Sequence, residues 1–314
     1  MKPASCTASF RLPLQSLFRY FLQLILLLFL APQSILAFST MPSSSTKQFK
    51  GVLFDMDGTL LDTEPLGCKA VYLTLQDKLS AEALAAFEDR HQLMEWELKQ
   101  KTLGLPGPAW AKIVLEWSHK YWGVPSPPSV EEFLKRHEEI MFEYIGTVEA
   151  CQGADELVQQ LANLQLTDAK TKLPMAIATS SYSTSVTEKR KHHEEMFSYF
   201  DTIVTGDDPA LKHGKPSPDI YLEAARRIGL NPKDCVVFED GMPGVQAGKA
   251  AGCFVVAIPD PRFTDDERKI FEQTADLVLE NLSQFPVASM FGAAGSTSSP
   301  QSQQEPQSQE SLSQ

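Results

Sequence analysis

Six short apolar runs rich in β-branched residues recur along the chain after residue 50, and they constrain the fold more than any other feature of the sequence. They lie at residues 51–55, 174–179, 201–205, 235–240, 253–259 and 276–280. Most are separated by segments whose apolar residues recur at helical spacing, at 153–164, 217–230 and 243–252. Strands that are apolar on both faces and alternate with helices predict an α/β fold, with a parallel sheet that helices cover on both sides.

The interval between the first and second runs is an exception, because it is long and helical in pattern. From Pro65 to Ile145 the apolar residues recur at helical spacing, with Gly/Pro breaks at 103–108 and 123–128. We therefore expect a helical domain of residues 65–146, inserted into a core that consists of residues 50–64 and 147–285. Such an insertion can act as a lid over groups presented at the end of the first strand.

The first 37 residues have the parts of a secretory signal peptide, namely a basic start, an apolar stretch from Tyr20 to Ala31 and small residues near Ala37. A membrane anchor is the alternative, but the stretch is shorter than the roughly 20 apolar residues of a membrane span. Residues 38–49 are Ser/Thr-rich and free of acids, as transit peptides are. Together the two segments resemble the bipartite presequences of algae with secondary plastids.

We therefore expect the chain to enter the secretory pathway and to reach a plastid, with secretion as the alternative and no stable membrane association of the mature form. Residues 292–314 are rich in Gly, Ser, Gln and Pro and are expected to be disordered.

The body of the chain is acidic. The formal net charge is −12, although every charged side chain before Asp55 is basic. This balance argues against general nucleic-acid binding. Cys235 and Cys253 open apolar runs and are expected to be buried thiols, while disulfides among the four cysteines after residue 50 remain possible in an oxidising compartment.

Unusual polar groups follow the ends of several predicted strands. Asp55 and Asp57 end the first run, Thr179 and Ser180 the second, and Glu239 and Asp240 the fourth. A segment after the third run contributes Lys215. Ligands of a parallel sheet gather beyond the carboxyl ends of its strands, so we expect these groups to converge on one cavity.

These residues suit Mg²⁺ and a phosphate ester. Asp55, Asp57 and Asp240 form an oxygen-only ligand set of the kind that Mg²⁺ prefers, and no His/Cys set competes with it. A dianionic phosphate also needs positive charge and hydrogen-bond donors before it can approach an aspartate. Lys215, the Thr179 hydroxyl and backbone amides near Ser180 and Gly58 could supply them.

Four motifs then make a family recognisable: DMDGT at 55–59, the strand-ending Thr179, GKP around Lys215, and VFEDG at 237–241. In order and spacing they resemble the motifs of the haloacid dehalogenase superfamily, over about residues 50–285. The finer resemblance is to the pseudouridine-5′-phosphatase and glycerol-3-phosphatase group. It implies a Rossmann-like core with a helical cap inserted after the first motif.

The resemblance also implies residue roles. Asp55 would be the nucleophile that forms an aspartyl-phosphate, and Asp57 the acid that protonates the leaving oxygen and then activates water. Thr179 and Lys215 would hold the phosphoryl group. Asp55, the Asp57 carbonyl and Asp240 would hold Mg²⁺, with Glu239 ligating or orienting it.

Some of these positions have simpler interpretations. The alternative for Thr179 is a hydroxyl that only caps the next helix, with Ser180 or Ser181 taking its role. The basic run 189–195 is expected to be a solvated helix face, and Asp207 and Asp208 are expected to shape their loop. In the cap, Lys101 is the best candidate for touching substrate.

The sequence thus predicts a Mg²⁺-dependent phosphomonoesterase that acts on a small phosphate ester and works as a monomer. Pseudouridine 5′-phosphate, glycerol 3-phosphate and similar sugar or nucleotide phosphates are candidate substrates. The first alternative is an isomerase like β-phosphoglucomutase, which usually carries a histidine just beyond the first motif, where this chain has Pro65 to Cys68. The second is a non-catalytic protein that binds phosphate ligands.

Overall fold

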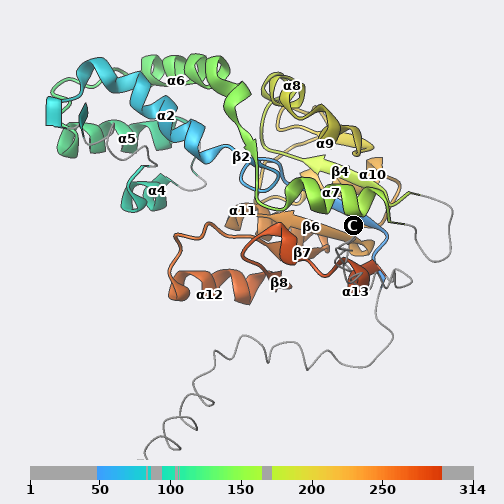
Figure 1. Ribbon diagram of the computed structural model, residues 1–314. Coiled ribbons are helices and arrows are strands. Elements are labelled where there is room, and N and C mark those ends of the chain that lie inside the picture. Colours follow the sequence, from blue (N-terminus) through green and yellow to red (C-terminus); the bar gives the residue numbers. More distant parts are fainter. Residues whose placement is uncertain are drawn as a thin grey trace, which may run out of the picture. The chain divides into compact units, whose positions relative to one another are not determined.

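The main sheet of the computed structural model is parallel throughout, as predicted. The structure describes residues 48–82, 84–85, 94–102, 105, 107–164 and 172–291. Within them the sheet has 6 strands in the order β5-β4-β1-β6-β7-β8 (Figure 1). In that order the strands span Thr202–Val204, Met175–Ala178, Gly51–Phe54, Cys235–Glu239, Phe254–Ala257 and Leu277–Val278. The strands therefore occupy the six apolar runs of the sequence.

Alternate residues of each strand feed two separate hydrophobic clusters. On β1, Val52 and Phe54 pack into one cluster and Leu53 into the other. The first cluster contains side chains of α7, α9 and α13, and the second those of α10, α11 and α12. The bounds of these six helices, in chain order, are Ala154–Ala162, Glu194–Ser198, Asp219–Arg227, Met242–Ala251, Asp265–Thr274 and Val287–Phe291. Both faces of the sheet are thus covered, which confirms the α/β fold class.

The segment expected to be inserted is helical in the part of it that the structure describes. Its helices are α2 (Glu64–Leu75), α4 (Trp96–Thr102), α5 (Gly107–Tyr121) and α6 (Val130–Tyr144), with 3₁₀ turns at Gln76–Lys78 and Ile145–Thr147. They share a hydrophobic cluster of their own that includes Val71, Leu98, Val114 and Phe133. We call residues 65–146 the cap, as the sequence suggested.

A short antiparallel pair joins the cap to the sheet. Strand β2 (Leu61–Asp62) leads into the cap and strand β3 (Glu149–Ala150) leads out of it. This pair was not predicted. The remaining helix, α8 (Ser183–His192), follows β4 and packs against the 3₁₀ turn at Ile145–Thr147, next to the cap's exit.

Other sequence predictions have different outcomes. The thiols of Cys235 and Cys253 are buried, as expected. Among the described residues, no helix has the length and apolar character needed to span a membrane. The predicted signal peptide (1–37), nearly all of the transit-like segment (38–49) and the tail (292–314) lie outside the described residues.

Candidate active site

The predicted polar residues lie just beyond the ends of neighbouring strands. Asp55 directly follows β1, and its amide continues the sheet by donating to the carbonyl of Phe238 at 3.0 Å. Thr179 follows β4 in the same way, with its amide donating to the carbonyl of Val204 at 3.0 Å. Glu239 ends β6 and Asp240 comes next. Because these strands are parallel and adjacent, the four residues share one edge of the sheet.

Lys215 lies between the first and fourth motifs in space. Its ammonium donates to Asp55 and, at 2.6 Å, to Glu239. The hydroxyl of Tyr221, on α10, donates to the same Glu239 oxygen at 2.5 Å. Burial alone would lower the pKa of Lys215, but the Asp55 and Glu239 carboxylates outweigh it and raise that pKa. Lys215 is therefore held as a cation against the predicted nucleophile.

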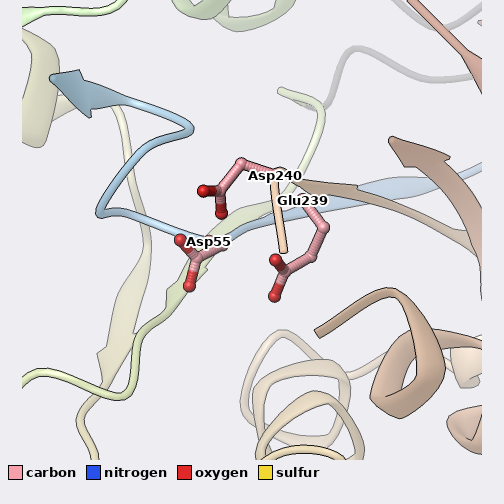
Figure 2. A group of neighbouring side chains, drawn as sticks. All are labelled: Asp55, Glu239 and Asp240. Atoms are coloured by element: carbon pink, nitrogen blue, oxygen red, sulfur yellow. The ribbon is translucent and has the colours of Figure 1, made fainter. Parts of the chain in front are cut away.

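Three carboxylates gather around this lysine. Oxygens of Asp55, Glu239 and Asp240 lie within 4.8 Å of one another, and Figure 2 shows the three side chains turned toward a common space. Burial raises the pKa of Asp55 well above its ordinary value, against the opposing charge of Lys215. Burial and then the charge of Glu239 raise the pKa of Asp240 to about 7. One ammonium does not neutralise three clustered acids, two of them buried, so the group suits a bound cation.

The three carboxylates are not equivalent as ligands. Glu239 is already engaged by Lys215, Tyr221 and, at 3.3 Å, the amide of Gly241. It is also only 2% exposed. These contacts favour an orienting role for Glu239 and leave Asp55 and Asp240 as the more available acids.

Two glycines let the carboxylates come this close to the backbone. A Cβ on Gly58 would lie 2.3 Å from an Asp240 oxygen, and a Cβ on Gly244 would lie 1.7 Å from a Glu239 oxygen. Gly58 also has φ of +86°. We expected its amide to face a phosphate, but that amide donates to the carbonyl of Leu61 at 2.8 Å. The contribution of Gly58 is therefore space for Asp240 within a tight turn.

The Asp57 side chain lies apart from the three acids. Its Oδ2 accepts a hydrogen bond from the Ser181 hydroxyl at 2.6 Å and a longer one from Thr179 at 3.4 Å. Its Oδ1 accepts from the ammonium of Lys189 at 2.5 Å. A ligand role for Asp57 would thus fall to its backbone carbonyl, as the family resemblance implied.

Lys189 corrects one sequence expectation. The run 189–195 was expected to be a solvated helix face, yet Lys189 is 3% exposed and, with Val186, forms the buried face of α8. Its neighbours follow the expectation, since Lys191 is exposed and pairs with Glu188. Helical spacing alone could not mark Lys189, because the attraction that buries it comes from Asp57, far away in the sequence.

The loop after β4 holds Thr179 and the two serines. Thr179 is 1% exposed, and its hydroxyl accepts the Ser181 amide at 3.0 Å instead of capping α8. Ser180 is exposed, and its carbonyl lies 2.2 Å from where a Cβ on Gly206 would be. Asp207 accepts from the Thr205 hydroxyl within its own loop, as expected of a residue that shapes it, and also from the amide and hydroxyl of Ser183 at the start of α8.

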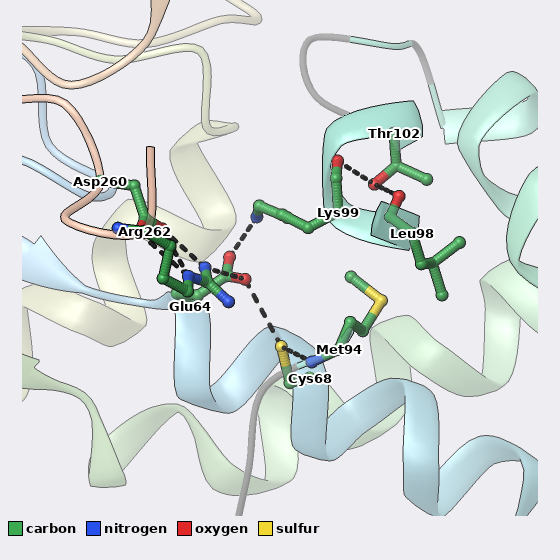
Figure 3. A network of polar contacts seen from close by, with 8 residues as sticks. All are labelled: Glu64, Cys68, Met94, Leu98, Lys99, Thr102, Asp260 and Arg262. Carbon is green, nitrogen blue, oxygen red and sulfur yellow. Dashed lines mark hydrogen bonds and ion pairs between the residues drawn. The ribbon is translucent and has the colours of Figure 1, made fainter. Parts of the chain in front are cut away.

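A polar network joins the cap to the core (Figure 3). Glu64, at the start of α2, accepts from Lys99 on α4 and from Arg262, 3.3 Å away, in the loop after β7. Arg262 also pairs with Asp260 and stacks on Trp96. Lys99 is close enough to oppose the rise in the pKa of Asp240. The predicted substrate contact, Lys101, is not part of this network. Its ammonium lies 3.5 Å from a carboxylate oxygen of Glu97, and half of its side chain is exposed.

Sequence reasoning missed Lys189, Tyr221 and Lys99, because all three sit on helices whose patterns looked ordinary. The available signal for Lys99 and Tyr221 was position. Tyr221 lies near the start of α10, shortly after the GKP motif, and Lys99 precedes the cap break at 103–108. No comparable signal marked Lys189.

Comparisons with known proteins agree with this geometry. Residues 49–252 match the haloacid dehalogenase-like hydrolase family. (DL)-glycerol-3-phosphatase 2 of Arabidopsis thaliana is 36% identical over 225 residues, which cover 71% of this chain and 84% of that protein. A protein of Saccharomyces cerevisiae named as a probable pseudouridine-5′-phosphatase is 37% identical over 221 residues, covering 68% of this chain and 83% of the yeast protein.

A solved structure shows the same fold. The HAD hydrolase, family IA, variant 3, of Entamoeba histolytica superposes with a TM-score of 0.57 at 23% identity, over 77% of this chain and 98% of that one. The chain therefore belongs to the haloacid dehalogenase-like hydrolases. Together with the two named relatives, this membership confirms the prediction of a phosphatase of this family.

Proposed function

We propose that this chain is a Mg²⁺-dependent phosphomonoesterase that transfers the phosphoryl group of a small, polar ester to Asp55 and then to water. The observation that carries the proposal is the pairing of Asp55 with Lys215 at the edge of the sheet, with Asp57 two residues further on. A carboxylate beside a fixed cation can approach a dianionic phosphate, which an isolated carboxylate would repel.

The first half of the reaction uses Asp55 and Asp57. An Asp55 oxygen attacks phosphorus and forms an aspartyl-phosphate, while the bond between phosphorus and the alcohol oxygen breaks. The electron pair of that bond stays with the alcohol oxygen, which takes a proton from the Asp57 carboxyl. Lys215 and the Thr179 hydroxyl hold the phosphoryl oxygens.

The second half regenerates the enzyme. Water attacks the same phosphorus and gives a proton to the Asp57 carboxylate, and the bond between phosphorus and Asp55 breaks. Inorganic phosphate leaves and Asp57 is again protonated. Asp57 is suited to this exchange because its side chain is 28% exposed, whereas that of Asp55 is 8% exposed.

The cluster of Asp55, Glu239 and Asp240 fits Mg²⁺, because its ligands are carboxylate oxygens and its negative charge exceeds the charge of Lys215. Asp55, Asp240 and the Asp57 carbonyl would hold the ion, and Glu239 would fix the geometry from behind through Lys215 and Tyr221. When bound, the ion offsets negative charge on the phosphoryl oxygens.

The cap side of the site supports a small polar alcohol as the leaving group. Lys99 acts electrostatically on Asp240, and Glu64 links Lys99 to Arg262, so the charged groups on this side suit hydroxyls better than a flat apolar ring. Glycerol 3-phosphate and compact sugar phosphates fit this lining. The named relatives support the same range, since one is a glycerol-3-phosphatase and the other is named for pseudouridine 5′-phosphate.

The test is a phosphate-release screen over small phosphomonoesters, with the wild type and Asp55→Asn in parallel. We expect release by the wild type with Mg²⁺, and loss of release by Asp55→Asn, which removes the nucleophile at nearly constant shape. Unchanged turnover of the variant would refute the covalent route. Conversion of β-glucose 1-phosphate into glucose 6-phosphate without phosphate release would instead support the isomerase.

A further inference from the structure

The buried ammonium of Lys189 has no part in the mechanism so far, although it contacts the acid/base residue directly. Lysine is rarely buried unless it is paired, because an unpaired ammonium loses its hydration. Lys189 has a side chain only 4% exposed, and its ammonium lies 2.5 Å from Asp57 Oδ1. The same ammonium donates to the Ser181 hydroxyl at 3.2 Å.

These contacts form a closed set around Asp57. Lys189 donates to Oδ1, the Ser181 hydroxyl donates to Oδ2 at 2.6 Å, and Lys189 also donates to Ser181. Both carboxylate oxygens are therefore held from one side, by α8 and the loop that precedes it. A carboxylate fixed at both oxygens has little freedom to rotate away from its working position.

Each of the two aspartates, Asp55 and Asp57, forms an ion pair with a different lysine. Lys215 pairs with Asp55 and Glu239, and Lys189 pairs with Asp57. Among the described residues, these are the ion pairs in which the two aspartates take part. Removing one lysine should therefore affect one aspartate and leave the other in place.

We propose that Lys189 is a positioning residue that holds Asp57 through Oδ1, so that Oδ2 faces the leaving oxygen. The bond to Lys189 joins two opposite charges, whereas the Ser181 hydroxyl is neutral, so the bond to Lys189 is the stronger of the two. When substrate binds, the weaker bond is the one that exchanges, and Oδ2 is the oxygen that passes the proton. This inference rests on the proposed function, since it gives Lys189 a role through the acid/base step.

The far end of α8 lies against the segment that leaves the cap. A ring nitrogen of His193 lies 2.9 Å from the carbonyl of Val148, just before β3. The helix that carries Lys189 is therefore fixed at the junction of cap and core as well as at Asp57, and the position of its ammonium is well defined.

The experiment compares two substrates that differ in their need for an acid. The leaving oxygen of glycerol 3-phosphate requires a proton, whereas p-nitrophenolate leaves without one. The variants are Lys189→Met, Lys189→Arg and the control Lys191→Met, which removes an exposed lysine of the same helix. Tm is measured for each, and kcat/KM is compared because it reports the first phosphoryl transfer.

We expect Lys189→Met to lower kcat/KM for glycerol 3-phosphate by about 10- to 100-fold, at the low end of what general acid catalysis contributes. The value for p-nitrophenyl phosphate should change little, and Lys191→Met should match the wild type with both. Lys189→Arg keeps the charge, so it should recover part of the loss. If Lys189→Met does not fold, Lys189→Gln takes its place, and a wild-type ratio of the two kcat/KM values for a charge-removing variant would overturn the proposal.

A second comparison uses the Asp57→Asn background, in which there is no acid left to position. Lys189→Met should cause no further loss there, because contacting residues that act as a unit are not additive. A further loss in that background, or an equal fall with both substrates in the parent, would overturn the proposal and indicate a role in folding or phosphate binding. If the wild type hydrolyses neither substrate, the proposed function fails instead.

Discussion

Substitution of Gly244 tests whether the position of Glu239 organises the site. The helical backbone at Gly244 does not itself require glycine. It lies in α11, where alanine is the better helix former by up to about 1 kcal/mol. A Cβ at this position would nevertheless lie 1.7 Å from a carboxylate oxygen of Glu239. Gly244→Ala must therefore displace a side chain that is only 2% exposed.

The expected cost follows from the bonds that Glu239 would lose. Its contacts with Lys215 at 2.6 Å and Tyr221 at 2.5 Å both involve a charged group. Bonds of this kind contribute about 1.5–3 kcal/mol each. After the helix gain is subtracted, the free energy of unfolding should fall by about 2–5 kcal/mol. For a chain of this size, that corresponds to a Tm lower by roughly 5 to 15 °C.

The assay is thermal unfolding together with phosphate release. Gly67→Ala is the matched control for stability, because nothing lies within 4 Å of its added methyl group, and its Tm should rise. Gly244→Ala should lower kcat as well as Tm, since Lys215 loses one of its two anchors. Introducing Gly244→Ala into a Glu239→Ala background should remove the penalty. A Tm for Gly244→Ala at or above that of the wild type, with normal kcat, would show that Glu239 does not organise the site.

Four further predictions concern the metal, the cap and the ends of the chain. A chelator should abolish phosphate release and Mg²⁺ should restore it, with Asp240→Asn needing more Mg²⁺ in the same titration; activity that survives chelation contradicts the proposed cofactor. Burial lowers the pKa of His137 from 6.5 to about 4, so its neutral form stabilises the fold above pH 6.5 and this stability is lost as the pH falls toward 4. At pH 5 the free energy of unfolding is lower by about 2 kcal/mol, so His137→Phe should make the difference in Tm between pH 7 and pH 5 smaller. The same difference in the variant and the wild type would contradict this prediction. Arg262→Ala breaks the contact with Glu64 and should raise KM for glycerol 3-phosphate more than it lowers kcat; a fall in kcat alone would place Arg262 outside substrate binding. A fluorescent protein fused to residues 1–50 should reach a plastid, whereas secretion or retention in the endoplasmic reticulum as an uncleaved product would support the other two interpretations of the presequence.

The central strands β4, β1 and β6 were predictable because they are buried on both faces. In the run from Val52 to Phe54, Val52 and Phe54 enter one hydrophobic cluster and Leu53 enters the other, an alternation that a strand buried on both faces provides. The pair β2 and β3 was not predictable, because each strand is two residues long and Leu61 pairs with Ala150, far along the chain. Short strands of this kind depend on tertiary pairing and carry little local signal.

The part of the site that follows strand ends was predictable wherever the strands were. Asp55, Thr179, Glu239 and Asp240 follow strand ends, so a correct parallel sheet brings them to one edge. Tyr221 has a helical position at which an aromatic side chain normally means core packing, and its packing into the second cluster agrees with that reading. Only the three-dimensional contact shows that its hydroxyl reaches Glu239.

Asp55 and Asp57 are two residues apart, yet the fold gives them different surroundings. Asp55 is buried among Lys215, Glu239 and Asp240, where charge is concentrated. Asp57 faces neutral hydroxyls and Lys189, with more than a quarter of its side chain exposed. A nucleophile benefits from the first setting, because a bound cation and the lysine can hold a phosphate against it, whereas an acid that must exchange protons with water needs the second. Different surroundings allow two neighbouring carboxylates of one site to take different chemical roles. The tight turn at Gly58 contributes to this difference, because it directs the chain away from the sheet immediately after Asp57.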